Sequence, residues 1–439
     1  MIRFASSTPS WARAITVLIL ISALASLAGC EWLWPSQVWT GDIASSSLDR
    51  DLDPDVSAGD VATLVAGNTA FAFDLLHQLA PDAGNLFYSP FSISAALVMA
   101  YAGAVGDTEA QMASTLHFDL DSGELHSAFN YVDLELNSRG TIEPPYEGEG
   151  FDLSVVNAAW GQRGYSFKRA YLDVLAVNYG AGLRLLDFQE DPEGSRETIN
   201  EWVSQETRDA ILDLLPPGSI DAATRLVLTN AIYFNAPWLD AFDPDETRTG
   251  VFEPLLGNAV DVPMMRQQIH LGYAAWDGGQ AVELPYNGYT LSMILLVPDR
   301  GTFEAFEAEF DAPRYESIVS ALELRMVTLR LPRFEASYEG SLVDPLVALG
   351  MTDPFITGAA DFSGIDGTRD LLISDILHKA WISVDEAGTE AAAATAVIMP
   401  VGGAGEPVTL TVDRPFLFAI RDIPTNTILF LGRIVEIVD

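Results

Sequence analysis

The sequence predicts an α+β fold with mostly antiparallel sheets, because helix-periodic segments lie mainly in its first half and apolar or alternating strand-like runs in its second half. The 439 residues would suffice for two or three average domains, and 49% of them are apolar, enough for a large core. After residue 61, however, no linker-like stretch and no internal repeat divides the chain. We therefore expect one large domain over residues 60–439.

The individual elements follow from hydrophobic period and from turn residues. Apolar residues recur at helical spacing in four segments, 60–79, 92–103, 195–215 and 341–349. Strand-like runs are 226–234, 291–297, 326–331, 382–384, 408–412 and 427–438. The acidic, glycine-rich stretch 139–150 is typical of a surface loop inside the domain.

The N-terminus has the pattern of a targeting signal. Arg3 and Arg13 precede a short apolar run, 14–25, which ends in small residues before Cys30. That length favours a signal peptide, residues 1–29, over a membrane-spanning helix. Residues 27–30 (LAGC) are similar to the lipobox of bacterial lipoproteins, and the resemblance implies that Cys30 is acylated and becomes the first mature residue. The alternative is an ordinary signal peptide followed by a free cysteine.

Cys30 is the only cysteine, so no intrachain disulfide can form. Residues 30–59 lack steady periodicity and predict a lipidated tether. We expect an extracytoplasmic protein anchored to a bacterial membrane. Glu31 favours the outer membrane or cell surface under the lipoprotein sorting pattern, and secretion is the alternative.

The charge balance is strongly acidic, with 62 acidic against 23 basic residues and a net charge of −39. Such a chain is repelled by nucleic acid and by anionic membrane surfaces, and we interpret the acidity as a solvated surface. The five histidines form no HExxH zinc pattern, and neither a GxSxG elbow nor a phosphate-binding glycine loop occurs. We therefore expect no enzyme, no cofactor and no metal site, although a Ser/His/Asp triad with distant members stays open.

Residues 386–397 (EAGTEAAAATAV) form a run of small side chains between two strand-like segments. In an extended chain, residues 389, 391, 393, 395 and 397 share one face, and Glu390 lies on the other. A segment that enters a closed sheet needs small uncharged side chains on the inward face and no proline, because each N–H must join a ladder. The alternative is a surface alanine helix capped by Thr389.

Short motifs along residues 60–439 resemble, in one consistent order, those of the serpin family. Independent chance matches would not keep this order. The motifs are 85–95 (NLFYSPFSISA), 200–203 (NEWV), 228–238 (LTNAIYFNAPW), 262–266 (VPMMR), 283–286 (ELPY), 331–334 (LPRF), 360–365 (ADFSGI), 377–380 (LHKA), 414–418 (RPFLF) and 429–433 (LFLGR).

The resemblance implies the serpin fold: three β-sheets, about eight or nine helices and an exposed reactive-centre loop at about 386–412. It also assigns three groups of residues to the loop-insertion machinery. The proximal hinge is Glu386, Gly388, Thr389, Glu390, Ala391, Ala392, Ala393 and Ala394; the buried polar "shutter" is Ser89, Ser92, Asn230 and His378; the "breach", where the loop first enters, contains Trp238. The alternatives are that Ser89 and Ser92 only begin a helix with Pro90, and that His378 and Trp238 are plain core residues.

The bond offered to a protease is placed by spacing and by chemistry. Counting from the hinge at the spacing of inhibitory serpins puts the cut after Gly402, and counting back from Pro415 puts it near Ala404. A small apolar side chain after a proline favours Val401–Gly402, with Gly402–Gly403 next. Such a residue suits the small pocket of an elastase-like protease. No Lys or Arg lies between Glu386 and Asp413, which argues against trypsin-like targets.

The resemblance implies an inhibitor that acts as a suicide substrate. The target serine or cysteine protease forms an acyl-enzyme with the loop, and the loop then inserts into the central sheet. We expect a monomer and no polyanion activator, because the sequence has no basic cluster. The alternatives are a non-inhibitory serpin that binds or stores a partner, which the small hinge residues oppose, and a hydrolase.

Overall fold

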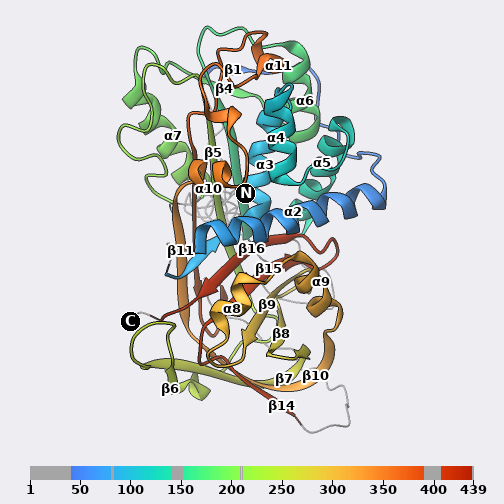
Figure 1. The fold of residues 1–439 in the computed structure, drawn as a ribbon, viewed down its shortest axis with the longest axis vertical. Coiled ribbons are helices and arrows are strands. Elements are labelled where there is room, and N and C mark those ends of the chain that lie inside the picture. Colours follow the sequence, from blue (N-terminus) through green and yellow to red (C-terminus); the bar gives the residue numbers. More distant parts are fainter. Residues whose placement is uncertain are drawn as a thin grey trace, which may run out of the picture. The chain divides into compact units, whose positions relative to one another are not determined.

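The computed structural model describes residues 41–80, 84–139, 152–207, 209, 211–389 and 407–437 (Figure 1). These residues form ten α-helices and two short 3-10 helices. Eight or nine helices were expected, and three of the ten have six residues or fewer. The α-helices are α2 (Ala58–Leu79), α3 (Pro90–Tyr101), α4 (Asp107–Leu116), α5 (Ser122–Ser138), α6 (Arg169–Tyr179), α7 (Pro192–Glu206), α8 (Phe303–Ala308), α9 (Ala312–Ser320), α10 (Val343–Ala348) and α11 (Ser363–Asp366), and the 3-10 helices are η2 (Pro244–Glu246) and η3 (Asp353–Phe355).

The central sheet has seven strands in the order β1-β4-β3-β5-β13-β12-β11. Two of its strands, β5 and β12, run parallel to each other, and β13 lies between their ends as an antiparallel neighbour of both. Their bounds are β1 (Ile43–Ala44), β3 (Asp152–Gln162), β4 (Leu183–Leu186), β5 (Leu226–Pro237), β11 (Phe334–Ser341), β12 (Ile376–Val384) and β13 (Gly388–Thr389).

A second ladder joins nine strands in the order β14-β10-β7-β8-β9-β15-β16-β2, with β6 paired to β7. Two sheets were expected here, besides the central one. The 17-residue strand β7 pairs with β6 and β10 along most of its length and with β8 near its end, so the two ladders are continuous. The bounds are β2 (Leu86–Tyr88), β6 (Arg248–Phe252), β7 (Val260–Trp276), β8 (Gly279–Pro285), β9 (Leu291–Pro298), β10 (Glu323–Pro332), β14 (Val408–Thr411), β15 (Phe416–Asp422) and β16 (Ile428–Ile434).

Helix ends follow local capping chemistry. The Ser57 hydroxyl caps α2, and the Ser89 hydroxyl caps α3, with Pro90 in the first turn. The helix expected over 195–215 is wrong in its second half, because α7 ends at Glu206. Beyond it the chain folds back along the helix. There the side chain of Asn200 satisfies both the N–H and the carbonyl of Leu215.

Helix α3 connects the two sheets, since it contacts β3 and β5 of the central sheet and β16 of the second. All but one of its residues are buried, and its run of apolar side chains belongs to the main core. The residues at its start, Ser89 and Ser92, are therefore held beneath the line where β5 and β12 meet.

The stretch 41–57, which belongs to the expected tether, packs against the body. Ile43 and Ala44 extend the central sheet by pairing with β4. Arg50 donates to the Asn130 side chain at 2.9 Å and pairs with Asp133 at 2.6 Å, both on α5. Among the described residues, no helix is long and apolar enough to cross a membrane.

Candidate functional site: the opening in the central sheet

The space between β5 and β12 divides into a closed half and an open half. In the closed half the strands pair directly, from Ile376 opposite Leu228 to Lys379 opposite Ala231. At the other end Thr389 of β13 lies between them, opposite both Ala236 and Val384. Between these two points, residues 232–235 and 380–383 have no register partner across the opening in the part of the chain that the structure describes. Over this length β5 and β12 do not pair with each other.

A buried polar network closes the seam at the end of the paired half. Asn230 accepts a hydrogen bond from His378 Nδ1 at 2.5 Å, and its amide donates to the Ser92 hydroxyl and, at 2.6 Å, to Asn157 Oδ1. The Ser89 backbone N–H donates to His378 Nε2 at 3.2 Å. The four residues expected to form the shutter therefore do lie together, and Asn157 of β3 joins them.

These bonds assign the protonation state of His378. Because Nε2 accepts from a backbone N–H, the single proton of the neutral ring sits on Nδ1 and faces Asn230. Burial lowers the pKa of His378 to about 3, so the ring is neutral at physiological pH. A neutral donor–acceptor pair can separate without leaving a charge in the core.

The breach is built around two stacked rings. Trp238 and Tyr286 lie face to face with centroids 4.5 Å apart, and both are buried. Trp238 holds the chain that leads into the hinge, since its indole N–H donates to the Asp385 carbonyl at 3.0 Å and its backbone N–H to the Ala387 carbonyl at 2.9 Å. The Tyr286 hydroxyl bonds the Thr389 hydroxyl at 2.8 Å. The first inward-facing hinge residue is therefore already in the core.

Glu386 is the first anionic residue of the hinge, and its carboxylate is bound by residues of the body. Its carboxylate accepts from the Arg333 guanidinium at 2.8–3.1 Å and from the Thr247 hydroxyl at 2.5 Å. Burial alone would raise the pKa of Glu386, but these donors outweigh it and the pKa is lowered. The base of the hinge is thus fixed by a charge-assisted contact.

Gly388 passes very close to the neighbouring strand. A Cβ at this position would lie 2.2 Å from the Ala236 carbonyl oxygen and 2.7 Å from the Pro237 Cα. Since no real Cβ tolerates such contacts, only glycine fits between β5 and β12 at this point.

The structure thus brings together Glu386, Gly388 and Thr389 at the breach with Trp238, and Ser89, Ser92, Asn230 and His378 at the shutter. Sequence reasoning gave no role to Asn157, Tyr286, Arg333 and Thr247, although Tyr286 and Arg333 lie within motifs that carry the family resemblance. The remaining predicted positions lie outside the described residues: Cys30, Glu390, Ala391, Ala392, Ala393, Ala394, Val401, Gly402 and Gly403.

Comparison with known proteins defines the class. The family model "Serpin (serine protease inhibitor)" matches residues 66–437. An uncharacterized serpin-like protein of Thermococcus kodakarensis is 40% identical over 434 residues, covering 96% of this chain and 98% of the relative. The leukocyte elastase inhibitor of Bos taurus is 39% identical over 382 residues, covering 84% and 98%. The chain belongs to the serpin family.

A solved structure supports the same architecture. The native state of tengpin, a thermophilic serpin, superimposes with a TM-score of 0.76 at 26% identity, covering 90% of this chain and 98% of that one. The α+β serpin fold expected from the sequence is confirmed. Because serpins are as a class protease inhibitors, the family also implies a target protease as partner.

Proposed function

We propose that this protein inhibits extracytoplasmic serine proteases as a suicide substrate, by loop insertion into the opening between β5 and β12. The observation that carries the proposal is that β5 and β12 pair with each other along only part of their length, while Thr389 is paired with both strands and Gly388 with β5. The opening has the width of one strand, and the residues that follow in the sequence have the small side chains that such a strand requires.

The register of Thr389 supports a definite path for insertion. Continuing the antiparallel pairing past Thr389 puts residue 391 opposite residues 234 and 382, and residue 395 opposite Asn230 and His378. Directly opposed residues share a face of the sheet, so Thr395 would bring its hydroxyl to the shutter. A hydroxyl can both donate and accept, so it can replace the bond between Asn230 and His378 that the incoming strand must break.

The chemical step belongs to the protease. Its nucleophilic oxygen attacks the carbonyl carbon of the bait residue, for which we propose Val401, and the amine of Gly402 leaves with a proton. This leaves the loop as an ester on the protease. Water would ordinarily hydrolyse the ester. Insertion competes with that hydrolysis, since it carries the bound protease along and distorts its active site.

We further propose elastase-like proteases as targets and attachment of the inhibitor to a bacterial membrane through acylated Cys30. Valine suits a small specificity pocket, and the relatives include a leukocyte elastase inhibitor. Several acyl chains on one residue would anchor the chain stably. Expression of the full precursor as Cys30→Ser should move the protein from the membrane fraction to the soluble fraction. An unchanged distribution would rule the anchor out.

Incubation of the mature protein with an elastase-like protease tests the main proposal. We expect a complex that survives SDS and heating, and mass spectrometry of the released C-terminal peptide should identify the cut bond. Clean loop cleavage without a complex would instead favour a non-inhibitory serpin.

A further inference from the structure

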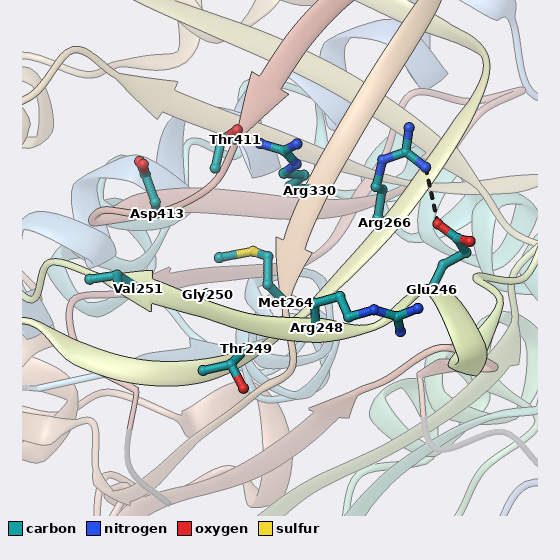
Figure 2. Close-up of a pocket in the computed structure, with 10 residues that line it drawn as sticks. All are labelled: Glu246, Arg248, Thr249, Gly250, Val251, Met264, Arg266, Arg330, Thr411 and Asp413. Atoms are coloured by element: carbon teal, nitrogen blue, oxygen red, sulfur yellow. Dashed lines mark hydrogen bonds and ion pairs between the residues drawn. The ribbon is translucent and has the colours of Figure 1, made fainter.

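A cavity of about 410 Å³ opens on the nine-stranded ladder where β6, β7, β10 and β14 lie side by side (Figure 2). We call it the arginine pocket, because three arginines line it. Its principal lining residues are Arg248 of β6, Met264 and Arg266 of β7, Arg330 of β10, Thr411 of β14 and, beside β6, Glu246.

Strand register puts the three arginines on one face. Arg330 is directly opposite Arg266, and Arg248 is directly opposite Met264, two residues before Arg266 on the same strand. Residues that are directly opposed, or two apart on one strand, point to the same side. Like charges in directly opposed positions destabilise a sheet, so the fold gains nothing from the arrangement of Arg266 and Arg330.

Most of the positive charge of the pocket is not neutralised by the described carboxylates of the same chain. Arg266 has one carboxylate partner, Glu246, at 3.2 Å. Arg248 donates to the backbone carbonyls of Asp245 and Thr247, which fix its position. Among the described residues, no carboxylate lies within ion-pair distance of Arg248 or Arg330, although the chain has 62 acidic residues. Both side chains are exposed, and their guanidinium groups remain available to an external anion.

The position of the pocket identifies the partner. Thr411, which lines it, belongs to the strand that follows the reactive loop. About nine residues separate Gly402 from Thr411, a span of at most about 30 Å. A protease of about 250 residues has a radius of gyration of about 18 Å, so the pocket lies within the reach of a protease that holds the proposed bait bond.

We propose that the arginine pocket is a docking site for an acidic surface segment of the target protease. The proposal rests on the proposed inhibitory function. It adds a contact outside the reactive loop that would select among target proteases. Guanidinium groups bind carboxylates in a bidentate manner, which gives orientation as well as attraction. A long polyanion fits less well, because the carboxylates of Glu246 and Asp413 also line the pocket and the whole chain carries −39.

The direct test uses fluorescein-labelled hexaglutamate and the intact protein, with binding followed by fluorescence anisotropy. The wild type should bind the peptide in a salt-sensitive manner, and Arg248→Ala/Arg330→Ala should lose about tenfold in affinity. The matched control is Arg325→Ala, an exposed arginine on the same strand β10, about 17 Å from Arg330 along the strand. Binding that is absent, or lost equally in the control, would overturn the proposal.

The functional test compares pancreatic elastase with the same enzyme after its lysines have been succinylated, which makes its surface acidic. The double variant should form the covalent complex with succinylated elastase about tenfold more slowly at low salt, at an unchanged stoichiometry of inhibition. Because the variant removes a like-charge pair, its melting temperature should not fall. An unchanged rate would overturn the docking role, as would acceleration of the wild type alone by heparin, which would indicate a polyanion site. Failure of the wild type and all variants to trap any protease would refute the inhibitory function. The peptide assay would still test whether the pocket binds an acidic segment.

Discussion

Gly388→Ala should convert the inhibitor into a substrate. The added Cβ would lie 2.2 Å from the Ala236 oxygen, so the hinge has to leave its position between β5 and β12. This movement breaks the 2.8 Å hydrogen bond between the Thr389 and Tyr286 hydroxyls. It leaves the hydroxyl of the fully buried Tyr286 without that partner. An unsatisfied buried polar group costs about 1–3 kcal/mol. We take about 2 kcal/mol as the free-energy cost of losing this hydrogen bond.

This free-energy cost changes the competition between loop insertion and hydrolysis of the acyl-enzyme. If the hinge contact is present when insertion begins, about 2 kcal/mol slows insertion roughly 30-fold. Hydrolysis of the acyl-enzyme belongs to the protease and is unaffected. The number of inhibitor molecules cleaved without trapping, per protease trapped, should therefore rise roughly 30-fold.

The assay is titration of an elastase-like protease, with the covalent complex and the cleaved inhibitor separated by SDS gel electrophoresis. Gly123→Ala is the matched control, because a Cβ there meets nothing within 4 Å and the residue lies in helix α5. The control should trap protease as the wild type does. If Gly388→Ala also keeps the wild-type stoichiometry, the prepositioned hinge does not guide insertion and the reasoning fails.

Three further outcomes follow from the same structure. Material cleaved in the loop should melt more than about 10 °C above intact material, since it fills the open half of the sheet; equal melting temperatures would remove the driving force. Burial lowers the pKa of His378 to about 3 and of His126 to about 4, so only the unfolded chain takes up these protons below pH 6.5. The free energy of unfolding should fall by about 0.7 kcal/mol per pH unit for each histidine near pH 6.5 and by about 1.4 kcal/mol per pH unit near pH 5, and His126→Gln should reduce that slope in urea melts. Arg50→Ala leaves the fully buried Asn130 short of a donor and should destabilise the intact form by about 1–3 kcal/mol, whereas Arg369→Ala, an exposed arginine, should not.

The sequence predicted the site residues best where polar or small residues interrupt apolar patterns. Ser89, Asn230 and His378 are buried polar residues within apolar segments, and the run after Glu386 is too uniformly small for an ordinary strand. Such residues carry their signal locally, so motif and face analysis could find them without coordinates.

The partners of these residues could not be found in this way, because they come from distant parts of the chain. Asn157 lies 73 residues from Asn230, and Thr247 lies 139 residues from Glu386. The arginine pocket is a further example. The sequence shows no basic cluster, and only strand register brings Arg266 beside Arg330. The early end of α7 was missed for the same reason, since the side chain of Asn200 captures a backbone segment well beyond the helix.

The two ends of the opening also set an order of events. β5 and β12 keep one register throughout, because Ala231 opposite Lys379 and Thr389 between Ala236 and Val384 correspond to the same alignment. The proposed insertion therefore needs the strands to move apart sideways, with no sliding of one along the other. In the proposed insertion, the first residues enter where β5 and β12 are not paired with each other, so they break no pair between these two strands. The paired half opens only when the strand reaches the shutter, where the bond between Asn230 and His378 crosses the seam. If the loop inserts as proposed, the shutter opposes the last part of insertion, whereas the hinge at the breach governs how it begins.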